Sequence, residues 1–208
     1  MGGHFVVLEG PDGSGKSTQA ERLVARWRAE GRDPLHLREP GTTPVGERLR
    51  ALLLAPDREA WDPRTEALMF FTARNELLRA EVAPAMAAGR DVVCERFTPS
   101  TLAYQGQSEE TERFVLALDE LVVAPELKPD CVLILDVEPS LGLARATGRG
   151  AADGFEARGA AFQERVRRGY LRYAEARPER SRVIRVDGLG LEEVEARVRA
   201  ALAEVLGG

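Results

Sequence analysis

Lysine, cysteine and histidine are all scarce in this chain, and each scarcity narrows the chemistry that it can perform. Its 29 basic residues include only two lysines, Lys16 and Lys128. Its two cysteines, Cys94 and Cys131, lie in separate valine- and leucine-rich runs, so we expect reduced core thiols rather than a disulfide or a metal site. The two histidines lie far apart in the sequence and have no companion ligands at the spacing of a zinc site.

Long hydrophobic runs and an excess of positive charge are also missing. No apolar stretch approaches the roughly 18 residues that a membrane-spanning helix needs, and the first residues, MGGHFVVLEG, enter a predicted strand without a cleavable signal. The net charge of −5 does not favour a nucleic-acid surface, although a local basic pocket could still take a small anionic ligand. We therefore expect a cytoplasmic enzyme of one domain, 1–208, with no nucleic-acid or membrane partner.

Five short β-rich runs recur along the chain, and segments with helical spacing separate them. The runs are too short for helices and mostly too continuously apolar for half-exposed strands, so they predict buried parallel strands. They lie at 4–9, 34–38, 91–95, 131–136 and 182–187. Helices are expected over 16–30, 63–88, 109–123, 140–147, 155–177 and 191–206, with Pro84 kinking or splitting the second. This alternation predicts an α/β fold with a parallel sheet covered by helices on both faces.

One segment, 146–159, breaks this alternation. It reads ATGRGAADGFEARG, is rich in glycine and alanine, and carries charge. It is either an ordinary surface loop or a mobile lid that brings Arg145, Arg149 or Arg158 over a phosphate, and its composition favours neither interpretation.

The clearest motif is GPDGSGKST, which follows the first predicted strand and opens the first predicted helix. It contains the pattern G-x-x-x-x-G-K-[ST] in the strand–loop–helix context that the pattern requires. Glycines let such a loop turn its N–H groups inward, the helix adds its positive end, and a compact lysine ammonium reaches the outer phosphates. We therefore expect this loop to bind a nucleoside triphosphate through Gly10, Pro11, Asp12, Gly13, Ser14, Gly15, Lys16, Ser17 and Thr18.

A magnesium ion is expected beside this loop. Ser17 offers a hydroxyl oxygen, and Mg²⁺ prefers octahedral oxygen ligands. A carboxylate partner is expected at the end of a neighbouring strand, where Glu95 and Asp136 both stand. We favour Glu95 for the metal, since Asp136 precedes an ordinary helix entry, VEPS, and is placed to cap that helix.

Three later stretches are unusually polar for the loops that hold them. Arg38 closes the second strand, where it either makes bidentate contact with a phosphate or is a solvated surface arginine. Phe70 and Arg74 share a helix face, so they either bind a planar base or divide between core and surface. The third stretch, ERFTPSTLAYQG, places polar side chains beyond a strand end, where they suit a sugar or base edge or else only cap and face a helix. Its candidates are Arg96, Ser100, Tyr104 and Gln105.

These stretches together resemble the thymidylate kinase family. The residues that carry the resemblance are GPDGSGKSTQ, REPGTTPVGERLR, MFFTARNE, ERFTPSTLAYQG and DVEPSLGLARATGRG, and it runs from about residue 4 to 187 in the family's order. The resemblance implies the nucleoside-monophosphate kinase fold, which is a P-loop three-layer fold with a five-stranded parallel sheet and a small mobile lid. It also implies transfer of the γ-phosphoryl group of ATP to dTMP, with Mg²⁺ as cofactor, and a homodimer.

The same resemblance implies roles for the acceptor residues. Asp12 matches the acid that binds the 3′-hydroxyl of the acceptor sugar, while Arg38 and Arg96 match the arginines that hold the acceptor phosphate. Phe70 matches the ring that stacks on thymine, and Arg74 the group that bonds its carbonyl. A tyrosine close to C2′ would exclude a ribose hydroxyl. The positions that match residues near the base and deoxyribose are Ser100, Tyr104 and Gln105.

On the donor side, the resemblance places Arg145 against adenine and Arg149 over the transferring phosphoryl group. Two departures from the family pattern matter here: Gly13 stands where some members keep a catalytic arginine, and the lid lacks the arginine of a DR-x-E pattern. A third departure is Glu95, which replaces the usual aspartate. We expect Arg149 rather than Arg158 to supply the missing charge. The other expected catalytic residues are Asp12, Lys16 and Arg96.

Three other functions stay open at this point. A deoxynucleoside kinase needs a base, and Glu95 with Arg96 resembles the acid–arginine pair of such enzymes. Another monophosphate kinase, for AMP or GMP, would keep the same phosphate loop. A nucleotide-binding switch module would carry an N-K-x-D guanine signal, which this sequence lacks.

Overall fold

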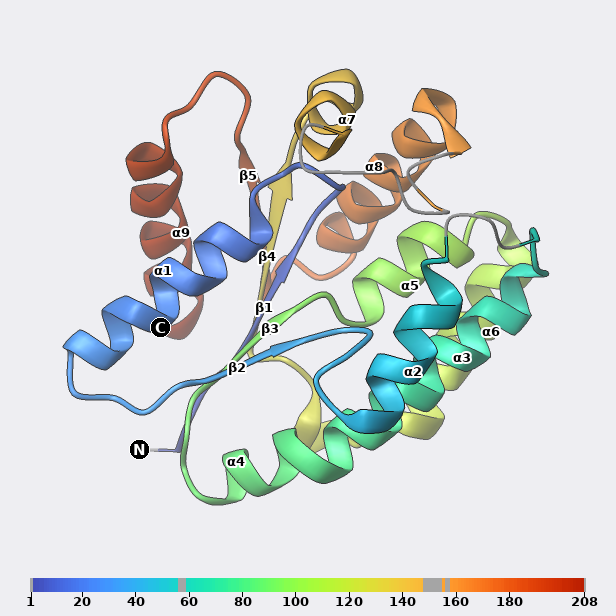
Figure 1. Ribbon diagram of the computed structural model, residues 1–208. Helices are drawn as coiled ribbons and strands as arrows, with labels where there is room; N and C mark the ends of the chain where they lie inside the picture. The colour runs from blue at the N-terminus through green and yellow to red at the C-terminus, as the bar shows by residue number, and fades with distance from the viewer. Residues whose placement is uncertain (1, 56–58, 148–154, 156–157, 208) are drawn as a thin grey trace.

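The computed structural model describes residues 2–55, 59–147, 155 and 158–207, and a parallel sheet forms its centre (Figure 1). The strands of this sheet are β1 (Phe5–Glu9), β2 (Leu35–Arg38), β3 (Val92–Glu95), β4 (Cys131–Asp136) and β5 (Ser181–Arg185). Their order is β2-β3-β1-β4-β5, and each pairing is parallel. The predicted α/β class with a five-stranded parallel sheet is confirmed.

Helices cover both faces of this sheet (Figure 1). One face carries α1 (Lys16–Ala29) and α9 (Leu191–Leu206). The other face carries α3 (Pro63–Leu77), α5 (Thr98–Gln105), α6 (Glu109–Val122) and α8 (Ala160–Glu175). The shorter elements are α2 (Pro44–Leu53), η1 (Leu78–Val82), α4 (Ala83–Ala87), η2 (Pro125–Leu127) and α7 (Pro139–Thr147).

The parallel arrangement brings the carboxyl ends of the strands to one edge. β1 and β4 are buried along their whole length, which accounts for their continuous apolar runs. The register pairs Glu95 at the end of β3 with Leu8 on β1 and with Arg38 on β2. The chain segments that follow β1, β2 and β3 therefore meet beside one another, as the strand-end argument requires.

Two predicted helices have different bounds in the structure. The helix expected over 63–88 is divided into α3, a π-helical turn at η1 and the short α4. The wider turn directly precedes Pro84 in α4, where the proline ring and its missing N–H disrupt regular α-helical hydrogen bonding. The helix expected from residue 155 begins only at Ala160, after Gly159 with a φ of 82°.

Both cysteines are free and buried, which confirms the predicted core thiols. Burial raises the pKa of the Cys131 thiol to about 12. Burial likewise raises the pKa of Cys94 well above its ordinary value. Among the described residues, no helix combines the length and the apolar character needed to cross a membrane.

Candidate active site

The loop between β1 and α1 has the backbone shape that its glycines permit. Gly13 adopts a φ of +75°, and a Cβ at this position would lie 2.0 Å from the carbonyl oxygen of Gly142 in α7. A side chain here would therefore be strained and would also collide with the backbone of α7. The loop and the start of α7 are in direct contact because residue 13 is a glycine.

Lys16 opens α1, and its ammonium folds back over the loop. Its Nζ donates to the carbonyl oxygens of Gly10 and Pro11, at 2.9 and 2.8 Å. Burial, assisted by the positive charge of Arg96, lowers the pKa of Lys16 to about 7. The charges of Asp12, Glu9 and Glu95 oppose this shift, and an incoming phosphate would add further negative charge beside the ammonium.

The two predicted metal ligands meet in the structure. The Ser17 hydroxyl donates to Oε2 of Glu95, whose other oxygen lies 3.0 Å from Nε2 of His36. Burial alone would raise the pKa of Glu95, but the bonds from His36 and Ser17 outweigh it and the net pKa is lowered. An ionised carboxylate beside a hydroxyl is an oxygen donor pair that suits Mg²⁺. No cluster of three or more His, Cys, Asp or Glu side chains suited to a metal occurs within the described ranges.

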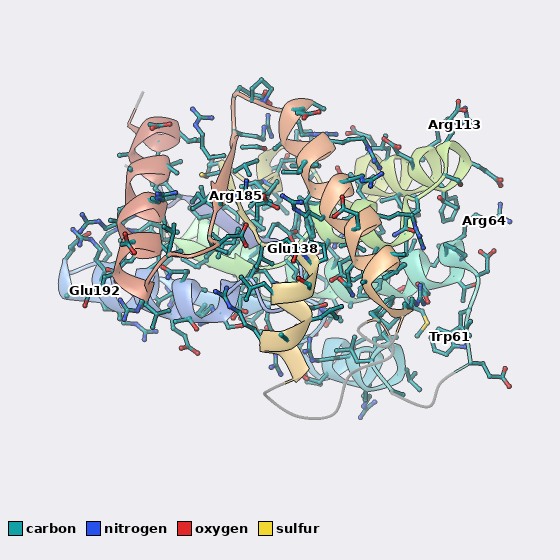
Figure 2. The ribbon with its side chains drawn as sticks, turned by 90° about the horizontal axis from the view of Figure 1, so that it is seen from above. Trp61, Arg64, Arg113, Glu138, Arg185 and Glu192 are labelled. Carbon is teal, nitrogen blue, oxygen red and sulfur yellow. The ribbon has the colours of Figure 1, made fainter. Side chains whose placement is uncertain are left out.

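Asp136, the alternative metal ligand, is engaged elsewhere. It receives two hydrogen bonds from the guanidinium of Arg167 on α8, at 2.6 and 2.9 Å. The predicted capping role of Asp136 is wrong, because α7 begins three residues later and Glu138 accepts from the backbone N–H of Ser140 instead. Figure 2 shows Glu138 at the start of α7.

Arg96 occupies a tight turn directly after β3. Its φ of 67° lies in the left-handed region, and its backbone N–H donates to the carbonyl of Leu8 at 3.0 Å. This strained backbone is typical of a functional position. The guanidinium donates to Oγ of Ser100 at 3.0 Å, to the hydroxyl of Tyr170 at 2.8 Å, and to Oδ1 of Asp12.

Asp12 therefore joins the phosphate loop to the neighbouring pocket. Its second oxygen accepts from the hydroxyl of Tyr104 at 2.8 Å. Burial acts to raise the pKa of Asp12, but the charges of Arg96 and Lys16 outweigh it, and the net pKa is lowered. The acid in the loop is ionised and points toward α5.

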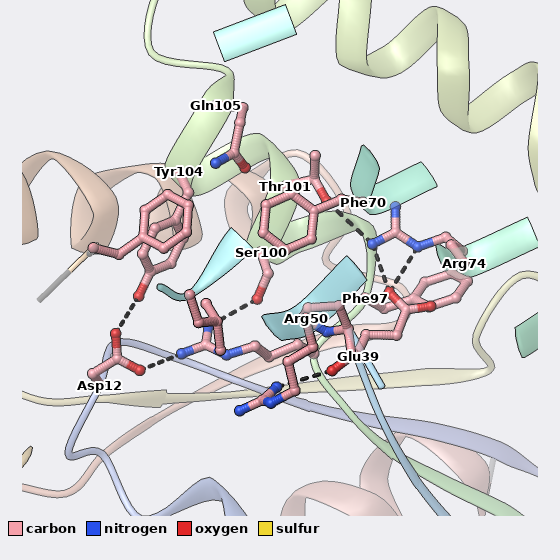
Figure 3. Close-up of a pocket in the computed structure, with 14 residues that line it drawn as sticks. Asp12, Glu39, Arg50, Phe70, Arg74, Phe97, Ser100, Thr101, Tyr104 and Gln105 are labelled. Atoms are coloured by element: carbon pink, nitrogen blue, oxygen red, sulfur yellow. Dashed lines mark hydrogen bonds and ion pairs between the residues drawn. The ribbon is translucent and has the colours of Figure 1, made fainter. Parts of the chain in front are cut away.

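A pocket lies beside this network, between the segment after β2, α3 and α5 (Figure 3). Arg74 is 1% exposed at its wall, and its Nε and Nη2 donate to Glu39 at 2.9 and 2.7 Å. Nη2 also donates to Thr101 at 3.1 Å, and the guanidinium lies over the rings of Phe71 and Phe97. Burial raises the pKa of Glu39 to about 7, although Arg74 opposes the shift.

Three polar atoms at this pocket have no partner among the described residues. They are Nη1 of Arg74, a donor, and two acceptors, Oε1 of Gln105 and Oε1 of Glu39. All three residues line the pocket, together with the half-buried ring of Phe70. Buried polar groups are normally satisfied, so an unpaired donor and acceptor in a cavity indicate a missing ligand.

The far side of the pocket is closed by Gln105, Glu66 and aromatic rings. Nε2 of Gln105 donates to Oε2 of Glu66 at 2.9 Å, and Arg158 donates to the other Glu66 oxygen at 2.6 Å. Phe155 lines the pocket, with its ring centroid 6.2 Å from that of Phe70 and 5.6 Å from that of Tyr104.

Other predicted residues lie at the edge of this arrangement. Arg38 does not line the pocket; it is half exposed and donates to Glu47 on α2 at 2.9 Å. Arg50, which the sequence did not single out, lines the pocket instead. Arg145 is exposed in the last turn of α7. Arg149 lies outside the described residues, as does most of the predicted lid.

Sequence reasoning missed several residues, of which Glu9 is the clearest. It ends β1, is completely buried, and accepts from the backbone N–H groups of Phe97 and Ser100 at 2.7 and 3.1 Å. It also accepts from the Ser100 hydroxyl at 2.6 Å. The signal that could have identified Glu9 was an acidic residue at the end of an otherwise apolar strand. The others are Glu39, Arg50, Glu66, Thr101, Phe155 and Tyr170.

Comparisons with known proteins agree with one another. The family model described as thymidylate kinase matches residues 8–198. A thymidylate kinase of Pseudomonas entomophila (strain L48) is 48% identical over 180 residues, covering 86% of each chain. One of Pseudomonas savastanoi pv. phaseolicola (strain 1448A / Race 6) is 44% identical over 206 residues, covering 99% of this chain and 98% of the relative. The crystal structure of thymidylate kinase from Ehrlichia chaffeensis is similar with a TM-score of 0.76 and 30% identity, covering 97% of this chain and 99% of that one.

Proposed function

This chain belongs to the thymidylate kinase family and transfers the γ-phosphoryl group of ATP to dTMP, and we propose that dTMP binds in the pocket between α3 and α5 while ATP binds on the loop after β1. The products are dTDP and ADP. Membership of this family rejects the deoxynucleoside kinase, the AMP or GMP kinase and the switch module as the chain's function.

The proposed position of the base rests on the unpaired donor of Arg74 and the unpaired acceptor of Gln105. Thymine presents carbonyl acceptors and an N3–H donor along one edge, which complement Nη1 of Arg74 and Oε1 of Gln105. Phe70 lines the same pocket with its ring half buried, so it is available for stacking on the base. A site that leaves polar groups unpaired without the right partner discriminates strongly against analogues.

The proposed positions of the sugar and phosphate of dTMP follow from the hydrogen-bond network around Arg96. We assign its guanidinium to the acceptor phosphate and Asp12 to the 3′-hydroxyl. Tyr104 touches Asp12 through its hydroxyl, so its ring lies at the sugar end of the pocket, where it would exclude a ribose hydroxyl. Arg38 would have to leave Glu47 to reach the phosphate, whereas Arg50 already lines the pocket.

The donor phosphates are assigned to the loop and to Lys16. The loop N–H groups and the positive end of α1 favour an anion, and Lys16 would exchange two loop carbonyls for phosphate oxygens. Arg145 is assigned to the adenine end of ATP. No general base is needed because the acceptor is already an ionised phosphate, so positioning and charge stabilisation carry the reaction.

Mg²⁺ fits the pair formed by Ser17 and Glu95, which would hold it at the end of β3. When bound, the ion neutralises charge on the donor phosphates. His36 would orient the Glu95 carboxylate through their 3.0 Å contact. Arg149 remains our choice for the lid arginine, and this choice fails if Arg149→Ala keeps kcat within about threefold of the unmodified chain.

A homodimer and a cytoplasmic location belong to the same proposal. Within α6 only Val115 is buried. The helices α2, α3 and α6 pack side by side, and each exposes a leucine side chain. Leu52 on α2 is 55% exposed, Leu68 on α3 is 49% exposed and Leu121 on α6 is 81% exposed. Such an apolar face favours association. The free thiols of Cys94 and Cys131 suit a reducing compartment. Light scattering on the pure chain tests the dimer: Leu121→Glu should give the mass of one chain where the unmodified protein gives two.

The central experiment measures ADP release by the pure chain with each nucleoside monophosphate in turn. We expect dTMP to give the highest kcat/KM, and Arg74→Gln to reduce the value for dTMP without increasing ATP hydrolysis. A chain that turned over dAMP or dGMP as fast as dTMP would contradict the placement of the base.

A further inference from the structure

Glu66 on α3 holds an unusual position for a charged side chain. It is 1% exposed, and each of its carboxylate oxygens accepts a hydrogen bond, from Gln105 and from Arg158. An ionised carboxylate accepts only, so the NH₂ group of the Gln105 amide must face Glu66. The amide carbonyl oxygen is then turned away from Glu66, and it is one of the two unpaired acceptors found at the pocket among the described residues.

We propose that Glu66 is a specificity-determining positioning residue that fixes the orientation of the Gln105 amide. This inference rests on the proposed binding of dTMP in the pocket. Thymine carries a donor at N3, whereas cytosine carries an acceptor there. With the carbonyl of Gln105 facing the base, the pocket accepts the thymine N3–H; with the amide reversed, it would present N–H donors and favour the cytosine edge.

Arg158 fixes the Glu66 carboxylate in the position that this role requires. Its guanidinium donates to one carboxylate oxygen, and the other oxygen accepts from the NH₂ group of Gln105. Loss of the Arg158 bond would free the Glu66 side chain to turn, and the Gln105 amide with it. Arg158 lies 2.6 Å from Glu66, and its guanidinium stands 4.6 and 5.0 Å from the ring centroids of Phe155 and Phe162. These contacts assign Arg158 to the base end of the pocket rather than to the transferring phosphoryl group.

The variant Glu66→Gln tests this directly, because it keeps the size of the side chain and gives it both a donor and an acceptor. Because Arg158 only donates, the carbonyl of the introduced amide pairs with Arg158 and its NH₂ group faces Gln105, so the Gln105 amide reverses and presents N–H donors to the base. We expect the ratio of kcat/KM for dTMP to that for dCMP to fall by at least about tenfold. Glu76→Gln is the matched control: it is the same substitution on the same helix, at a carboxylate paired with Arg79. It should leave the ratio unchanged.

The exchange variant Glu66→Gln/Gln105→Glu separates positioning from general damage. The carboxylate introduced at position 105 would again present only acceptors to the base, so the ratio should recover by about tenfold relative to Glu66→Gln. A purely structural role for Glu66 predicts no such recovery. If Glu66→Gln does not melt cooperatively, Arg158→Leu replaces it, since that position is partly exposed, and the ratio should fall in the same direction.

Two results would distinguish a failure of this inference from a failure of the proposed function. A folded Glu66→Gln chain with a dTMP to dCMP ratio within about twofold of the unmodified chain overturns this inference and leaves the proposed function standing. An unmodified chain that binds no dTMP by calorimetry refutes the placement of dTMP instead, before any variant is compared.

Discussion

The phosphate loop and the acceptor pocket are built by opposite means. In the loop, Lys16 bonds to carbonyls only six and five residues away. In the pocket, Arg74 pairs with Glu39 across 35 positions, Gln105 with Glu66 across 39, and Arg96 with Asp12 across 84. The loop is a local motif with backbone donors, whereas the pocket consists of charged and polar side-chain pairs that exist only once the sheet has formed.

This contrast predicts that substitutions in the phosphate loop and in the acceptor pocket have different effects on folding and activity. A side chain removed from the loop should impair phosphoryl transfer with little effect on folding. A side chain removed from the pocket should impair folding and recognition together, because each buried charge there depends on its partner.

The largest effect is expected at the loop. Lys16→Ala should reduce kcat by about 10³-fold or more, because the charge on the transferring phosphoryl group loses a close cation. The affinity for dTMP, measured by calorimetry, should change little. Thermal melting should show a stability equal to or above that of the unmodified chain, since a buried ammonium has been removed. If Lys16→Ala also lost affinity for dTMP, the proposed separation between the phosphate loop and the acceptor pocket would be contradicted.

The next effect concerns the stability of the pocket. Arg74→Met should lower the free energy of unfolding above pH 7 by about 3–5 kcal/mol, because Glu39 is left as an uncompensated buried charge. Arg74→Met/Glu39→Met should recover most of this loss. Urea unfolding measures both, with Arg79→Met, at an exposed pair on the neighbouring turn, as the control. A single variant as stable as the unmodified chain would show that the pair is not a structural constraint.

A smaller effect should follow the pH. Burial raises the pKa of Glu39 from 4.5 to about 7, so the folded chain binds this proton more tightly than the unfolded chain does. The resulting stability is present in full below pH 4.5 and is lost as the pH rises through about 7. In Glu39→Gln this contribution is absent, so its stability should fall less over that window. Urea unfolding across the same range decides the matter, and parallel pH profiles for the two chains would contradict it.

The smallest effect is expected where the two regions meet. Tyr104→Phe removes one hydrogen bond to Asp12, and it should lower kcat/KM for dTMP by about fivefold, equivalent to about 1 kcal/mol. Steady-state kinetics with ATP saturating gives the value. Tyr173→Phe, which changes a tyrosine outside this pocket, serves as the control. An unchanged kcat/KM in Tyr104→Phe would mean that this bond does not orient Asp12 for the acceptor.

The same contrast explains what the sequence could predict. Short β-rich runs located the five strands, and the glycines with Lys16 identified the loop, because both signals are local. The side-chain network of the pocket was not predictable in this way. Glu39 lies in the stretch REPGTTPVGERLR and Glu66 in none of the quoted stretches, but neither position reveals its role, since each acquires that role from an arginine or an amide far along the chain. Asp136 was misjudged as a helix cap for the same reason: Arg167, its partner, lies 31 residues away.

The two buried thiols have a practical consequence. Cys94 and Cys131 are the only cysteines of the chain, and burial raises the pKa of each, so neither is reactive toward maleimide dyes in the folded state. Cysteines introduced on α6, for example at the exposed Arg113, and within 146–159 would then carry a fluorophore pair without native background (Figure 2). Energy transfer between the dyes, recorded as ATP and dTMP are added, would show directly whether the glycine-rich segment moves like a lid.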